Sequence, residues 1–192
     1  MSRLQVLVSQ PRLALGAVLT LALASAAIVG SGADFTASSA NPANTFSSGT
    51  LAISNSSSNA AVFTASNLRP GGASQSGTVD IGNSGSLSGL FKLSRGTIAD
   101  SGSTSNLSPK LNMVIVDCGT FAGGAPTCGD SDDVSVYTGA LPGIGTSASP
   151  ITLGTFNGGD KHRYKFTVSL DSTADNSYQG GTSTVDFNWT AG

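Results

Sequence analysis

The feature that most constrains the fold of this chain is the alternation of apolar and polar residues close to its C-terminus. Tyr164, Phe166, Val168 and Leu170 occupy every second position, and polar residues separate them. Residues 185–189 repeat the pattern with two large aromatic side chains. A period of two is typical of a β-strand that buries one side and exposes the other. The sequence therefore predicts two half-buried strands here.

The composition also favours strands over helices. The chain has 192 residues, about one domain's worth, and its eleven acidic residues are all Asp. The usual residues of helix surfaces are scarce, whereas 31 Ser, 19 Thr and 25 Gly suit strands joined by turns. The formal charge of -2 comes without a Lys/Arg cluster. Binding to nucleic acid is therefore not expected.

Further strands are expected where apolar runs are bounded by Gly, Pro, Asn and Ser. Nine strands in all predict an all-β fold, a single antiparallel β-sandwich. Residues 111–116 are apolar nearly throughout, which predicts a strand covered on both faces. Tight turns are expected at residues 69–72 and 157–160, and surface loops at 101–109 and 138–149. The remaining expected strands are residues 46–53, 61–66, 77–81, 87–93, 134–137 and 151–156.

Residues 1–33 are typical of an export signal, with an expected signal helix. Arg3 and Arg12 precede the apolar stretch 13–29, and small residues follow it. Cleavage is expected after Ala33, and cleavage after Ala26 is the alternative. An uncleaved membrane anchor is a second alternative, because the stretch approaches the length of a bilayer span. The processed chain would be secreted, with seven Lys or Arg against eleven Asp, a net charge of -4.

Only two cysteines, Cys118 and Cys128, are present, with nine residues between them. Outside the cytoplasm this spacing favours a disulfide that closes a surface loop. A zinc site is not expected, because two thiols and one distant imidazole, His162, fall short of four ligands. We place His162 on the solvated approach to the following strand.

An acidic run follows Cys128 and is a weak candidate for a Ca²⁺ site formed by Asp130, Asp132 and Asp133. The run does not match an EF-hand loop, since the sixth and twelfth positions from Asp130 are Ser135 and Leu141. A solvated acidic loop is the alternative interpretation. No other metal and no cofactor is expected.

Several sequence blocks resemble one family. The run Ala-Asp-Asn-Ser-Tyr-Gln-Gly at 174–180 and the strands around it, 164–170 and 185–191, resemble the C-terminal signature of the TasA/camelysin family of secreted fibre-forming proteins. The Leu-Arg-Pro-Gly turn at 68–71 and residues 46–51 are similar to its middle and its start. Further similar blocks are 76–79, 83–87 and 91–94.

The resemblance implies a jelly-roll-like sandwich at 46–192, export through a signal peptidase, and assembly into biofilm-matrix or surface fibres. In such fibres residues 34–45 would be a donor strand that completes the sheet of the next subunit. Asp34, Phe35, Thr36 and Ala37 would begin that strand, with Phe35 as its apolar anchor. A frayed terminus is the alternative.

The expected partners are therefore other copies of the chain, signal peptidase during export, and an accessory protein or minor fibre subunit. Contact with a membrane is expected only through the uncleaved signal. A monomeric secreted module that binds matrix polysaccharide or protein is a different possibility, and Trp189 and Tyr178 are considered for such a surface. Core packing is favoured for Trp189 because it shares the parity of Val185 and Phe187. A metallopeptidase is not expected, because the chain has no Glu and no His-Glu-x-x-His motif.

Overall fold

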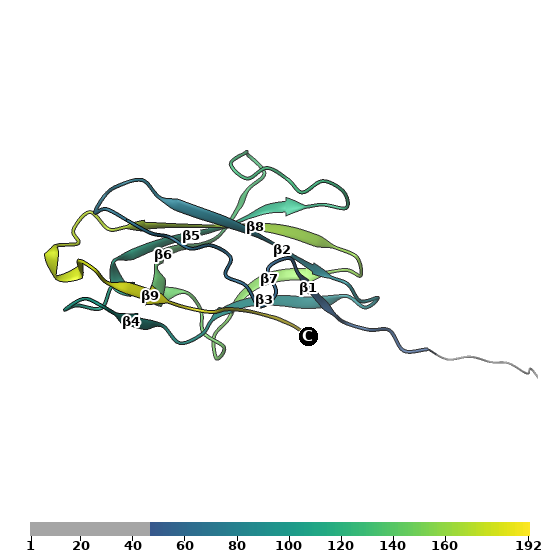
Figure 1. The fold of residues 1–192 in the computed structure, drawn as a ribbon. Coiled ribbons are helices and arrows are strands. Elements are labelled where there is room, and N and C mark those ends of the chain that lie inside the picture. Colours follow the sequence, from purple (N-terminus) through teal and green to yellow (C-terminus); the bar gives the residue numbers. More distant parts are fainter. Residues whose placement is uncertain (1–46) are drawn as a thin grey trace, which may run out of the picture. The chain divides into compact units, whose positions relative to one another are not determined.

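The structure is a computed structural model, and it describes residues 47–192. The expected signal segment, cleavage sites and donor strand lie outside these residues. The described chain is built from antiparallel strands and three short 3-10 turns, and it contains no α-helix (Figure 1). The strands are β1 Ile53–Asn55, β2 Gln75–Asn83, β3 Gly89–Arg95, β4 Ala99–Ser101, β5 Leu111–Thr120, β6 Val134–Ala140, β7 Ile151–Phe156, β8 Lys161–Leu170, β9 Thr182–Thr184 and β10 Phe187–Ala191.

The strands form three antiparallel sheets. The largest has the order β1-β2-β8-β5-β6, the second β10-β3-β7, and the third joins β4 to β9. β8 lies at the centre of the largest sheet, where Phe166 is opposite Gly77 of β2 on one side and Ile115 of β5 on the other. The prediction of an antiparallel all-β chain is therefore confirmed for the described residues.

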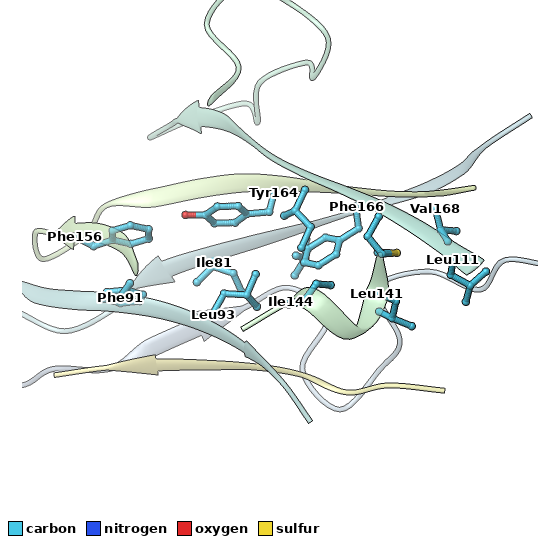
Figure 2. Close-up of a cluster of buried hydrophobic side chains, with 13 residues drawn as sticks. Ile81, Phe91, Leu93, Leu111, Leu141, Ile144, Phe156, Tyr164, Phe166 and Val168 are labelled. Carbon is cyan, nitrogen blue, oxygen red and sulfur yellow. The ribbon is translucent and has the colours of Figure 1, made fainter. Parts of the chain in front are cut away.

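The core lies between the five-stranded and three-stranded sheets (Figure 2). Tyr164, Phe166 and Val168 of β8 are buried, as their alternation predicted. Phe91 of β3 and Phe156 of β7 stack with ring centroids 4.2 Å apart at one end of this core. The inward residues of both layers thus form one continuous apolar cluster.

Both expected turns are present. Gly72 donates its backbone N–H to the carbonyl of Arg69, and between them Pro70 sets φ while Gly71 has a φ of 65°. A positive φ at this third position is what a type II turn requires, and Gly adopts it without steric cost. The second turn closes through the N–H of Asp160 and the carbonyl of Asn157.

The segment 61–66 was predicted as a strand, and the prediction is wrong. These residues belong to no strand, and the apolar Val62, Phe63 and Ala65 pack against the core instead. Gly77 of β2 makes room for them, because a Cβ atom there would overlap the Val62 carbonyl and the Phe63 side chain. The segment therefore contributes side chains to the core rather than a strand to the sheet.

Other strand boundaries also differ from expectation. Of the strand predicted at 46–53, only Ile53 lies in a strand of the described chain, at the start of β1, so the prediction is wrong for 47–52. The two expected loops are shorter at their N-terminal ends, because Ser101 lies in β4 and 138–140 lie in β6. Residues 111–116 are not covered on both faces. Leu111, Met113 and Ile115 are buried, but Val114 on the opposite face is 37% exposed.

Candidate functional site

The strand β6 is an outer strand of the five-stranded sheet, and one of its two sides is unpaired in the described chain. Among residues 47–192 it pairs only with β5, and none of its seven residues is buried. Val134, at its start, is 62% exposed. A free edge presents main-chain N–H and C=O groups that can pair with an added strand, and natural edges usually carry charge, Pro or a cover against this. β6 has neither a charged residue nor Pro; the same is true of the edge strands β1, β7 and β10, but β6 is the longest of the four, which makes it the candidate assembly site.

The predicted disulfide between Cys118 and Cys128 is present, with the two Cα atoms 5.0 Å apart. It closes the base of the loop between β5 and β6. Arg163 of β8 connects this loop to the sheet, because its Nη1 donates to the Pro126 carbonyl at 3.5 Å while Nε and Nη2 donate to the Asp80 carboxylate at 2.7 and 2.9 Å. The bond to Asp80 raises the pKa of Arg163. The loop is thus held by the disulfide and by a hydrogen bond from Arg163, whose guanidinium is oriented by its ion pair with Asp80.

The acidic run of this loop does not form a ligand cluster. Asp130 accepts a hydrogen bond from the N–H of Asp132 at 3.1 Å, and Asp133 accepts one from the N–H of Gly129 at 2.7 Å. Within the described part of the chain no group of three His, Cys, Asp or Glu residues is placed to hold a metal ion. The carboxylates of Asp130 and Asp133 thus accept hydrogen bonds from backbone N–H groups of their own loop.

His162 does not lie on a solvated approach, and that prediction is wrong. Its ring stacks on Phe156 with centroids 4.2 Å apart, and its Nδ1 is 2.7 Å from Oδ2 of Asp117. The side chain of His162 is only 17% exposed and that of Asp117 14%. His162 shares the even parity of Tyr164 and Phe166, so the alternation already contained the signal that it points inward.

Tyr164 continues the same aromatic row, and its hydroxyl points along the core toward Phe156 (Figure 2). The hydroxyl is buried and has no hydrogen-bond partner within residues 47–192. Burial, followed by the negative charge of Asp117, raises the pKa of Tyr164 far above its usual value. The neutral phenol is therefore favoured in the folded chain.

The two aromatic residues considered for a ligand surface, Trp189 and Tyr178, make other contacts in the structure. Trp189 packs against the core, with its ring 5.2 Å from Tyr164 and edge-on to Phe166, which confirms the preference for core packing. Tyr178 lies below the Lys110 ammonium, 5.9 Å from its ring centroid. Neither ring lines the two hollows beside Phe121.

Asp171 organises the turn that follows β8. Its carboxylate accepts hydrogen bonds from the N–H and hydroxyl of Thr173, at 2.8 and 2.6 Å, and from Asn112 at 3.3 Å. The Thr173 bonds, chiefly the one from the hydroxyl, lower the pKa of Asp171 from 3.8 to about 2. The ionised carboxylate is thus favoured in the folded chain.

We expect this carboxylate to make the fold sensitive to acid. Because the folded pKa is depressed, the stabilisation is present above the ordinary carboxyl pKa near pH 4 and is lost as the pH falls toward about 2. Thermal melts at pH 5 and pH 2.5 should show a smaller fall in Tm for Asp171→Asn than for the parent chain. Asp132→Asn is the control and should behave as the parent; an equal fall in all three chains would contradict the prediction.

In residues 47–192 no helix is long and apolar enough to cross a membrane. A comparison with protein-family models gives no match, and a comparison with curated proteins gives no significant similarity. The resemblance to fibre-forming proteins therefore stays a prediction from the quoted sequence blocks.

Proposed function

We propose that this chain is a secreted structural subunit that polymerises into extracellular fibres of a matrix or cell surface. Residues 34–45 would leave their own domain and pair with a free sheet edge of the next copy. The observation that carries the proposal is the edge strand β6, which among the described residues has one partner, no buried residue and an exposed Val134. An extended peptide added there would gain main-chain hydrogen bonds and cover an apolar side chain.

The geometry of such a contact would explain how a fibre grows from its subunits. The donor lies before the sandwich and the acceptor is a strand within it, so donor and acceptor are different surfaces of one subunit. A contact of this head-to-tail kind produces an open filament when its rotation does not close a ring. No accessory protein is needed for growth itself, although one could start it.

Two further features support the proposal. The layers of five and three antiparallel strands are compatible with a jelly-roll-like β-sandwich, which is the fold we infer from the resemblance. The disulfide Cys118–Cys128 favours an oxidising compartment, as expected after export and signal cleavage. Both are general features, and the length of the uncharged edge strand β6 is what favours it as the acceptor.

A charge on the acceptor edge tests the proposal. Val134→Lys is expected to reduce the sedimentable fibre yield by about tenfold or more, because a Lys on an edge strand opposes pairing with a further strand. Yield is measured by sedimentation and by negative-stain electron microscopy of the exported chain. The fold should remain intact, since Val134 is mostly exposed.

The matched control is Leu87→Lys, which places the same charge on a residue that is 50% exposed in the connection between β2 and β3. It should form fibres at the parental yield. Normal fibres from Val134→Lys would exclude β6 as the acceptor. A parent chain that elutes as a monomer under all conditions would instead favour the monomeric binding module.

A further inference from the structure

A row of four residues crosses the solvent-facing side of the large sheet near one end. Ser54 of β1 is opposite Gly82 of β2, and Gly82 is opposite Lys161 of β8. Phe121 follows β5 and donates its backbone N–H to the Lys161 carbonyl at 2.9 Å. Since His162 points into the core, its neighbour Lys161 points to the opposite, solvated face.

This row borders two hollows of about 250 and 270 Å³. Phe121 and Lys161 line both of them. The first also reaches Gly82, where a Cβ atom would lie 2.7 Å from Cγ of Lys161 and 2.8 Å from Oγ of Ser54. The absence of a side chain at Gly82 therefore leaves the space open. An aromatic residue thus borders two adjoining hollows.

The wall that carries Phe121 is fixed in place. Phe121 lies inside the ring closed by the disulfide Cys118–Cys128, and Arg163 links the same loop to Asp80, which also lines the first hollow. An aromatic side chain on a constrained loop loses little conformational entropy when it binds a ligand. The arrangement is therefore suited to binding without prior rearrangement.

Several polar atoms around the first hollow have no partner inside the described chain. Oγ of Ser54, Nδ2 of Asn55 and Nζ of Lys161 form no hydrogen bond with another described residue, whereas Oδ1 of Asn55 accepts from the N–H of Ser57. These groups provide a hydroxyl, an amide and an ammonium beside an aromatic ring. A few polar groups that converge on an apolar wall are the usual composition of a small-ligand site.

We propose that these hollows bind two successive hexose units of a neutral extracellular polysaccharide. The C–H groups on one face of a sugar ring carry partial positive charge and are attracted to the negative face of an aromatic ring such as Phe121. The sugar hydroxyls can pair with Ser54, Asn55 and Lys161. Each hollow is smaller than the roughly 300 Å³ of a drug-sized site, which fits one sugar unit better than a large cofactor.

Other classes of ligand fit less well. A peptide strand would need free main-chain groups, but β2 and β8, which lie under the hollow, are paired with a strand on both sides, and the free edge of β1 faces away from β2 and the hollow. A polyanion would need several cations; Lys161 is one, and Arg163 is already paired with Asp80. The net charge of -4 expected for the exported chain also opposes a polyanion.

Affinity electrophoresis of the exported chain, at a concentration low enough to keep it monomeric, tests the proposal, with a soluble neutral β-glucan or with polygalacturonate in the gel. The parent chain should be retarded by the glucan. Phe121→Ala should weaken this binding by about five- to tenfold. Lys161→Met, which keeps the length of the stem and removes the donor, should weaken it independently.

Leu87→Ala is the control, because Leu87 is half-exposed in the connection between β2 and β3 and lines neither hollow. It should bind the glucan like the parent. Thermal melts of each variant show whether the fold is retained. Equal retardation of Phe121→Ala and the parent, or no retardation of the parent, would overturn the proposal, and retardation by polygalacturonate alone would overturn the choice of a neutral sugar. Fibre yield should not change in Phe121→Ala, so the result is independent of the polymerisation proposal.

Discussion

Deletion of residues 34–42 is expected to abolish fibres completely. The truncated chain would keep the acceptor edge β6 but lose the strand that we propose to occupy it in the next copy. An edge without its donor cannot extend a filament, because head-to-tail growth needs both surfaces on every subunit. Size-exclusion chromatography of the exported chain should then give one monomeric species, and electron microscopy should show no filaments. Fibres at normal yield would refute the donor role of this segment.

A mixing experiment separates strand donation from non-specific association. The deletion variant supplies only an acceptor, and Val134→Lys supplies only a donor. Each alone should be monomeric, and an equimolar mixture should give a 1:1 dimer that does not grow further. A small fraction of the deletion variant added to the parent chain should also shorten its fibres by capping them. Long fibres from the mixture, or no effect on parental fibres, would contradict the model.

The sequence predicted the parts of the fold that depend on local patterns. β8 and β10 were found from alternation, because every second residue of a half-buried strand must be apolar. The turn at Arg69–Gly72 was found because Pro at the second position and Gly at the third match the backbone angles of that turn type. The disulfide followed from compartment and spacing.

The errors concern information that is not local. β4 and β9 are three residues each, and their pairing joins Asp100 to Ser183, so neither strand has a recognisable pattern of its own. Val62 and Phe63 were assigned to a strand because they are apolar and β-prone, but their backbone passes across Gly77 and their side chains enter the core. Tertiary packing overrode strand propensity there.

The two candidate surfaces, the edge β6 and the hollows beside Phe121, differ in how much of each could be predicted from the sequence. Val134 could be placed on a strand, but its exposure depends on β6 being an edge, which only the sheet order reveals. The hollow beside Phe121 depends on the register that puts Ser54, Gly82 and Lys161 in one row. Register is set by long-range pairing, and a shift of one residue would turn these side chains to the other face.

Phe166→Ala is expected to cause the largest loss of stability of any substitution proposed for the described chain. Phe166 is fully buried at the centre of β8, and its ring lies 4.7 Å from that of Phe187 and edge-on to Trp189. Replacing a buried Phe by Ala removes its transfer free energy and leaves a cavity, which together cost about 3–5 kcal/mol. The layers meet at this ring, so the cavity would form between them.

For a domain of this size the expected fall in Tm is roughly 10–15 °C, measured by calorimetry or circular dichroism at pH 7. Phe166→Leu should lose much less, because most of the buried volume is retained. Leu87→Ala, at a half-exposed position, should change the free energy of unfolding by no more than about 0.5 kcal/mol. If Phe166→Ala melted like Leu87→Ala, the two sheets could not be sharing one core at this residue.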